Sequence, residues 1–112
     1  MKNEELKIQA ESFKWLREHG IFCHSVPNEA AGRSKVMQAQ LAGAGLVSGV
    51  ADMVVWWPVG IGYLEFKTPT GKQSQHQKTF QNLCESCGVS YRVVHSLEDV
   101  KAVAKEMGCV EE

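Results

Sequence analysis

Two carboxylates and a lysine in the middle of the chain have the types and spacing needed for chemistry on a phosphate. Asp52 begins one strand-like run, and Glu65 and Lys67 lie two positions apart in the next run. Side chains alternate along a strand, so Glu65 and Lys67 should share one face while Phe66 points to the other. The simplest alternative, a surface salt bridge between Glu65 and Lys67, is compatible with the same spacing.

Asp52 joins Glu65 only if the turn between the two runs has the right length. This turn contains Pro58 and Gly60. In an antiparallel hairpin, a loop with an even number of residues, such as Pro58-Val59, would set Asp52 opposite Glu65. An odd loop would put the two carboxylates on opposite faces unless a bulge intervened. The sequence leaves both registers open.

If the two carboxylates do meet, the arrangement calls for a cation, because each raises the energy of the other's charge. Magnesium suits such a pair, since it takes one or two protein carboxylates and keeps several waters. A bound magnesium ion polarises a phosphate and lowers the pKa of a water. Lys67 could orient that water or neutralise charge on the transferring phosphoryl group. Asp52, Glu65 and Lys67 together would therefore indicate hydrolysis of a phosphodiester.

The hydrophobic pattern predicts one mixed α/β domain, residues 1–112, that positions these side chains. We expect helices at 4–19, about 35–41, 75–87 and 97–107, and strands at 21–26, 52–57, 61–67 and 89–95. The first helix should bury the apolar stripe Leu6, Ala10, Phe13 and Leu16. Ser34 and Ser96 are expected to cap helices, and Gly20 and Gly88 to end them. The predicted order is α-β-α-β-β-α-β-α, a mixed sheet flanked by helices.

Composition and charge allow a nucleic-acid partner without requiring one. The net charge of −1, with 22% charged residues, is that of an ordinary soluble protein with charges of both signs on its surface. DNA binding would have to rest on local patches and on bound metal. The amino-terminal segment is charged, and no apolar run is long enough to span a membrane. We therefore expect an intracellular, cytoplasmic protein.

The cysteines fit that compartment. Cys23, Cys84, Cys87 and Cys109 would be free thiols in a reducing environment. The alternative is a structural zinc site built on Cys84 and Cys87. Zinc sites of this kind need a second pair of ligands, which only Cys23-His24 could supply. His24, His76 and His95 otherwise have no spacing typical of ligands, and we interpret them as structural or surface residues.

The motifs around the carboxylates resemble the VRR-NUC family, a branch of the PD-(D/E)XK nuclease superfamily with a restriction-endonuclease-like core. The matching segments are Gly49-Val50-Ala51-Asp52, Glu65-Phe66-Lys67-Thr68-Pro69-Thr70-Gly71-Lys72 and Ser74-Gln75-His76-Gln77. The resemblance runs from the first helix through the last strand. One departure is Ala51, where the superfamily motif has proline. That position supplies backbone shape rather than a ligand.

The resemblance implies a role for each matching residue. Asp52 and Glu65 would hold Mg²⁺, which Mn²⁺ could replace, and the Phe66 carbonyl would be a further ligand. Lys67 would position the attacking water. Members of the family also carry an acidic residue on the first helix, and we match it to Glu11, acting directly or through a water. Glu4 and Glu18 lie on the same stripe as Glu11, and the alternative is that all three are solvated.

Gln77 has two explanations that are compatible with each other. Ser74 and Gln77 have the spacing of a capping box, in which the glutamine closes the start of a helix. The resemblance places Gln77 at the border of the active site instead. Gln77 also shares a helical face with Phe80 and Cys84, which points it inward.

Basic and aromatic residues suggest where partners bind. The resemblance extends to Asn28, Arg33 and Lys35, and these residues with Lys72 could contact DNA phosphates, although a plain solvated loop is compatible with the same sequence. Alternation requires Trp56 and Trp57 to face opposite ways. One of them should enter the core, and the other could form a partner surface.

Taken as a whole, the resemblance implies a metal-dependent DNA endonuclease of bacterial or phage-like type. Stand-alone members of the family are similar to Holliday-junction resolvases, so branched DNA is the expected substrate and a homodimer the expected assembly. The alternative is a non-catalytic nucleic-acid-binding module that retains the fold. The presence of Asp52, Glu65 and Lys67 together argues against that alternative.

Overall fold

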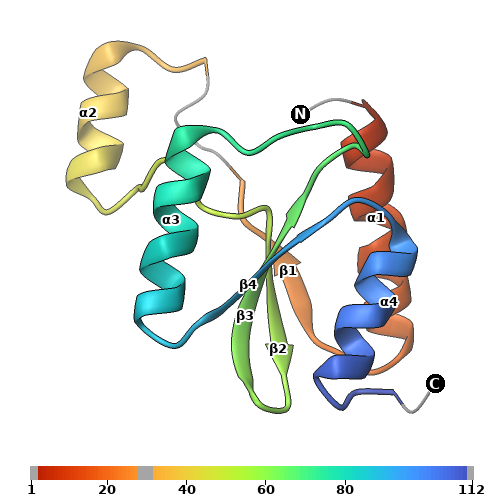
Figure 1. Cartoon of the computed structure of the whole chain (residues 1–112). Helices are drawn as coiled ribbons and strands as arrows, with labels where there is room; N and C mark the ends of the chain where they lie inside the picture. Colours follow the sequence, from red (N-terminus) through yellow and green to blue (C-terminus); the bar gives the residue numbers. More distant parts are fainter. Residues whose placement is uncertain (1–2, 28–31, 111–112) are drawn as a thin grey trace.

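The computed structural model describes residues 3–27 and 32–110, which form a mixed sheet with helices on both faces (Figure 1). The elements are α1 (Asn3–Glu18), β1 (Cys23–Ser25), α2 (Lys35–Gly43), β2 (Met53–Trp57), β3 (Gly60–Phe66), α3 (Gln75–Ser86), β4 (Ser90–Val94) and α4 (Leu97–Glu106). Strands lie in the order β1-β2-β3-β4. The pairs β1–β2 and β2–β3 are antiparallel, and β3–β4 is parallel. The predicted fold class and element order are confirmed.

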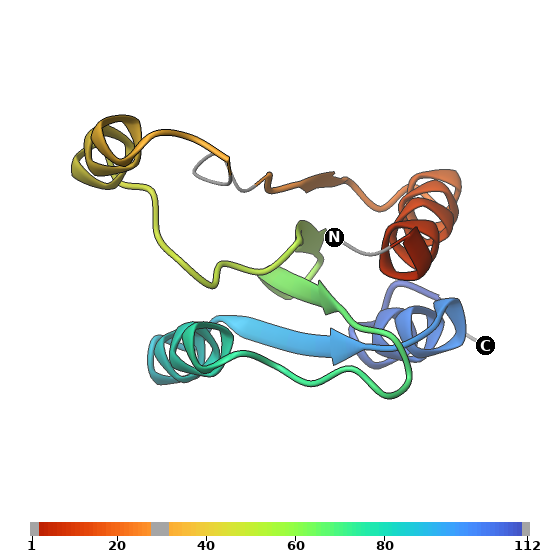
Figure 2. The same ribbon diagram turned by 90° about the horizontal axis from the view of Figure 1, so that it is seen from above.

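Each face of the sheet has its own core. Helices α1 and α4 cover one face, and α3 covers the β3–β4 part of the other (Figure 2). The larger core lies under α1 and α4 and is built on Met53, Leu64 and Phe66. The smaller core lies under α3 and holds Ala51 and Tyr91. Because both faces are covered, the central strands are apolar on both sides.

The β2–β3 hairpin has the register that brings the two carboxylates together. Its loop is Pro58-Val59, since Trp57 pairs with Gly60 and Met53 with Leu64. The same register sets Asp52, which directly precedes β2, opposite Glu65 at the end of β3. The even loop that the sequence allowed is therefore confirmed.

The two tryptophans of β2 face opposite ways, as alternation requires. Trp57 is 4% exposed in the core under α1 and α4, whereas Trp56 is 53% exposed. Trp56 packs edge-on against Phe22 with the ring centres 5.0 Å apart. Trp56 is therefore the member of the pair that is free to meet a partner.

The prediction for the buried face of α1 was wrong in part. Leu16 and Ser12 are fully buried, but Leu6 remains 54% exposed and Phe13 39% exposed. The helix has a second apolar stripe, Ile8 and Trp15, that packs against the core instead. Trp15 also lies against α4, where Lys101 sits 5.9 Å from its ring centre. Contact with α4 therefore rotates α1 away from the orientation that its hydrophobic pattern favoured.

Helix α2 lies to one side of the sheet, beyond α3 in Figure 1, and none of its residues is fully buried. Its predicted cap is confirmed, because the Met37 amide donates to the Ser34 hydroxyl at 3.1 Å. Strand β1 is shorter than the predicted 21–26, although the Val26 amide still donates to the Asp52 carbonyl at 2.8 Å. Within the described ranges, no helix is long and apolar enough to cross a membrane.

Candidate active site

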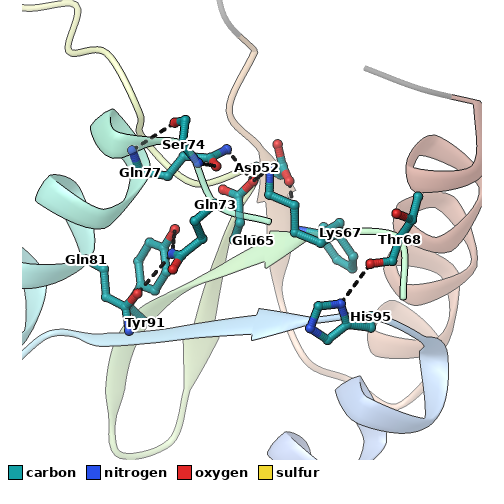
Figure 3. A network of polar contacts seen from close by, with 11 residues as sticks. Asp52, Glu65, Lys67, Thr68, Gln73, Ser74, Gln77, Gln81, Tyr91 and His95 are labelled. Atoms are coloured by element: carbon teal, nitrogen blue, oxygen red, sulfur yellow. Dashed lines mark hydrogen bonds and ion pairs between the residues drawn. The ribbon is translucent and has the colours of Figure 1, made fainter. Parts of the chain in front are cut away.

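Asp52 and Glu65 lie side by side where β2 begins and β3 ends (Figure 3). Asp52 is fixed by the backbone, since its Oδ2 accepts a hydrogen bond of 2.8 Å from the Phe66 amide. Glu65 is only 2% exposed. Strand alternation explains the placement: Leu64 and Phe66 point into the core, so Glu65 between them points to the other face.

The two carboxyls affect each other's ionisation in opposite directions. Burial, and then the charge of Asp52, raises the pKa of Glu65 to about 8, although the Lys67 ammonium acts in the opposite direction. Burial also raises the pKa of Asp52, while the Phe66 amide, a hydrogen bond with Glu65 and the charge of Lys67 lower it. Without a cation, the pair therefore holds a proton at neutral pH. Such perturbed carboxyls in a cleft are typical of functional sites.

One oxygen of Glu65 is held by protein donors and the other is not. Its Oε2 accepts a hydrogen bond of 2.7 Å from Gln77 Nε2 and lies 3.7 Å from Lys67 Nζ. Its Oε1 is buried and has no hydrogen-bond partner among the described residues. A buried oxygen of this kind normally has a partner. The second oxygen is therefore the one that remains for a cation.

The donor set fits magnesium better than zinc. Nowhere in residues 3–27 or 32–110 do three or more His, Cys, Asp or Glu side chains group into a metal site. Two carboxylates with room for water match magnesium, which keeps several waters of its own, whereas structural zinc takes four nitrogen or sulfur ligands. Cys84 and Cys87 are free thiols, and Cys84 is buried under α3 beside Ala51 and Tyr91. The residues present thus do not support the zinc alternative.

The carboxylates lie in a cleft of about 760 Å³. Its walls come from α1, the end of β1, the loop before Asp52, and the start of α3. Lys67 and Gln77 line the cleft with Asp52 and Glu65. His76, which the sequence suggested was structural or a surface residue, lines it as well.

The acidic residue that α1 contributes to the cleft is Glu5. Its charge also reaches Asp52 and Glu65, raising the pKa of both. Glu11 is exposed and does not line the cleft, so the structure does not bring this predicted site residue to the carboxylates. Glu11 shares a stripe with Ile8 and Trp15, which pack against the core, Trp15 also lying beside Lys101 of α4. The spacing of Glu5 and Gln9, one helical turn apart, is the signal that could have identified the cleft-facing side.

Gly49 allows the loop before Asp52 to reach α3. Its φ is +82°, and a Cβ atom there would lie 2.3 Å from the His76 carbonyl oxygen. Only glycine tolerates both the conformation and the approach. Ala51, the position where the superfamily has proline, is fully buried against Cys84 and Tyr91. Alanine at this position therefore still packs the loop before β2 against α3 and β4.

The capping box predicted for Gln77 is confirmed, and the same side chain also contacts Glu65 of the candidate site. The side-chain Oε1 of Gln77 accepts a hydrogen bond of 2.8 Å from the Ser74 backbone N–H. The backbone N–H of Gln77 donates to the Ser74 hydroxyl at 3.2 Å. These two bonds form the capping box at the start of α3. The Nε2 of the same side chain donates to Glu65, as described above, so one residue links the helix start to the site.

Two further contacts fix the surroundings of the site (Figure 3). Gln73 Nε2 lies 3.3 Å from the Tyr91 hydroxyl, and burial followed by the charge of Glu65 raises the pKa of Tyr91 to about 12. His95 Nδ1 lies 3.0 Å from the Thr68 carbonyl oxygen and so anchors the chain just after Lys67. Tyr91 therefore stays neutral beneath the carboxylates.

The basic residues predicted to bind DNA lie outside the cleft. Arg33, Lys35 and Lys72 are exposed, and none of them lines it. Asn28 lies outside the described residues. Their role in binding stays a prediction.

A mixed sheet with two carboxylates and a lysine at the strand ends, and a glutamine at the start of α3 beside them, fits a nuclease-type domain. Comparisons agree with this class. The model of the VRR-NUC domain family matches residues 3–98. A solved structure described as a VRR_NUC domain has a TM-score of 0.67 and 22% identity, over 93% of this chain and 97% of its own. Comparison with curated proteins gave no match. The chain belongs to the VRR-NUC family.

Proposed function

We propose that this protein hydrolyses DNA phosphodiester bonds with Mg²⁺, or with Mn²⁺ in its place. The observation that carries the proposal is the pair of half-buried Asp52 and buried Glu65, with Lys67 Nζ 3.7 Å from Glu65 and one Glu65 oxygen left without a donor. Membership of a nuclease family supports the same reaction. The four free cysteines fit an intracellular protein.

Each side chain has a separate task in this mechanism. Asp52 and Glu65 Oε1 would hold the cation, with the Phe66 carbonyl as the further ligand that the family resemblance implies. Once bound, the cation neutralises charge on the phosphate and makes water a better nucleophile. Gln77 keeps Glu65 Oε2 occupied, so that the carboxylate cannot turn. Lys67 is placed to orient the attacking water and to stabilise negative charge on the phosphate.

Cleavage of labelled DNA tests the proposal. Four-way junctions, flaps, single strands and duplexes would be incubated with Mg²⁺, Mn²⁺ or EDTA. Asp52→Asn and Lys67→Ala should each lose about 100-fold or more of the activity, the scale for a lost transition-state contact. The controls Glu98→Gln and Lys105→Ala, on exposed positions of α4, should keep it. No product from the wild type on any substrate would favour the rival, a non-catalytic binding module.

We further infer a homodimer that selects branched DNA. The support is the family resemblance together with exposed apolar side chains on the hairpin, Trp56 and Ile61. A two-fold axis would give two sites for symmetrically placed strands. Light scattering should find a dimer, and competition should favour a four-way junction over duplex. A clean monomer at working concentration would remove the dimer and leave the chemistry in place.

A further inference from the structure

A second, smaller groove opens beside the catalytic cleft. It holds about 220 Å³ and lies between α1 and the sheet. Its lining is Leu6, Gln9, Ala10 and Phe13 from α1, Ser25 from β1 and Met53 from β2. Leu6, Gln9 and Ser25 line the catalytic cleft as well. The two spaces are therefore neighbours that share a wall.

The groove has the chemistry of a site for a flat, mostly apolar ring with a polar edge. Most of its walls are aliphatic and aromatic side chains, and the side-chain amide of Gln9 supplies a polar group that could bind the edge of the ring. The Gln9 Oε1 is buried and has no hydrogen-bond partner among the described residues. A volume of 220 Å³ is below the roughly 300–1,000 Å³ of sites for drug-sized ligands, which limits the occupant to a small ring system.

The Phe13 wall is held in place from its far side. The Arg17 guanidinium lies 4.8 Å from the Phe13 ring centre and 4.7 Å from that of Phe22. Arg17 is itself fixed, because its Nε and Nη2 donate to the Cys23 carbonyl at 3.1 and 2.9 Å. An exposed phenylalanine with a fixed ring is a suitable surface for a stacked base.

We propose that this groove binds the base of an unpaired nucleotide next to the phosphate that is cut. This inference rests on the proposed nuclease function and deepens it by naming what the site selects. A phosphate held by the catalytic cleft leaves its neighbouring nucleoside beside Leu6 and Gln9. Inside a duplex that base is stacked and paired, and it can enter the groove only when it is free. The Gln9 side-chain amide can accept from and donate to the edge of such a base, and adenine, with its N6 donor beside its N7 acceptor, is a suitable probe.

Binding without cleavage provides the test. Two hairpin DNAs of equal length would be compared, one fully paired and one with a single unpaired adenine, each with a paired 2-aminopurine next to that position as a reporter of unstacking, in Ca²⁺ and again in EDTA. The wild type should bind the second DNA about 10-fold more tightly or better, with a change in 2-aminopurine fluorescence. Gln9→Ala should lose about 5- to 100-fold of this preference, the range for one bidentate base contact.

Filling the groove gives an independent variant with a matched control. Ala10→Leu adds bulk to the wall and should abolish both the preference and the fluorescence change, whereas Ala102→Leu, at an exposed position of α4, should keep both. Equal affinity of the wild type for the two DNAs would overturn the proposal. So would a preference that survives Ala10→Leu. If Ala10→Leu instead changes the sedimentation of the free protein, the groove is an interface between copies and the base site is wrong.

The outcomes separate this inference from the nuclease function on which it rests. A wild type that prefers the unpaired DNA but cuts neither DNA with Mg²⁺ has the base site and lacks the activity. A wild type that cuts DNA but binds both hairpins equally has the activity and lacks the base site.

Discussion

Gln77 performs two tasks with one side chain, and the two can be separated by mutation. Its Oε1 closes the capping box with Ser74, while its Nε2 donates to Glu65. The other half of the capping box is the hydrogen bond from the Gln77 backbone N–H to the Ser74 hydroxyl, and it does not involve Glu65. Loss of that half should weaken only the helix.

Ser74→Ala and Gln77→Ala are therefore a matched pair. Ser74→Ala should reduce the free energy of unfolding by about 1 kcal/mol, the usual effect of a lost helix cap, and keep most of the activity. Gln77→Ala should show a similar loss of stability together with about 10–100-fold lower metal affinity or activity, since it also releases Glu65. Chemical denaturation and cleavage rates measure the two effects. Equal losses of activity in the two variants would mean that Gln77 acts only through the helix.

Glu65 makes the stability of the metal-free protein depend on pH in an unusual direction. Its pKa is raised from 4.5 to about 8, so the folded chain keeps a proton that the unfolded chain releases between these values. In a pH range where the folded state binds more protons than the unfolded state, the free energy of unfolding decreases as the pH rises. The raised pKa of Asp52 acts in the same direction.

The melting temperature in EDTA should therefore decrease as the pH rises from about 5 to 8. In Glu65→Gln, whose amide does not ionise, the decrease should be much smaller, and the variant should melt several degrees above the wild type at pH 8. Thermal unfolding followed by circular dichroism across this range measures both. A wild-type melting temperature that rises over the range would contradict the raised pKa.

At the scale of elements, the loop before β2 determines whether the site closes. Gly49 lets this loop contact the start of α3, and Gln77 from α3 then meets Glu65 from β3. A side chain at position 49 would have to displace the backbone at His76. The cleft that holds Asp52 and Glu65 thus depends on one close approach between a loop and a helix.

Gly49→Ala should destabilise the protein by about 1–3 kcal/mol or more, because the new methyl group meets both an unfavourable φ and the His76 carbonyl. Activity at temperatures where the variant stays folded should also fall, since the start of α3 moves. Gly43→Ala, at the end of α2, is the control, because a Cβ atom there would have no neighbouring atom within 4 Å and the φ of Gly43 is not positive. This variant should leave the free energy of unfolding unchanged or raise it slightly. Normal stability of Gly49→Ala would show that the loop can relax.

At the scale of the whole molecule, three carboxylates from distant parts of the chain line one cleft together with one lysine. Glu5 comes from α1, Asp52 from the start of β2 and Glu65 from β3, and Lys67 only partly offsets them. Their mutual repulsion is a force against folding that a cation would relieve. Binding to the folded state alone stabilises it in proportion to the logarithm of the ligand concentration.

Mg²⁺ should therefore raise the melting temperature at pH 8, by an amount equivalent to about 2.7 kcal/mol at 100 times its dissociation constant. Asp52→Asn should abolish most of this shift, whereas Glu98→Gln should leave it unchanged. Differential scanning calorimetry with increasing Mg²⁺, and with Na⁺ at equal ionic strength, measures it. A shift of the same size in Asp52→Asn would place the cation elsewhere.

Local sequence was sufficient to determine the order of the elements and the helix caps, and it limited the hairpin to two registers, of which the structure has the one with the even loop. Each depends on residues close together in the chain: Ser34 beside α2, or the loop Pro58-Val59 between two strands. The same local patterns placed Glu65 and Lys67 on one face. Conformational preferences and alternation act over a few residues, so they can be derived from the sequence alone.

Only the tertiary structure decided which side of α1 faces the site. The helix has two apolar stripes, and packing against the core and α4 partly buries Ile8 and Trp15, while Leu6 and Phe13 stay exposed. That rotation brings Glu5 and Gln9 to the cleft and leaves Glu11 exposed. The pKa of about 8 for Glu65 has the same origin, because it depends on burial and on a carboxylate from another strand. Orientation and electrostatics are set by contacts between distant elements, and no local pattern contains them.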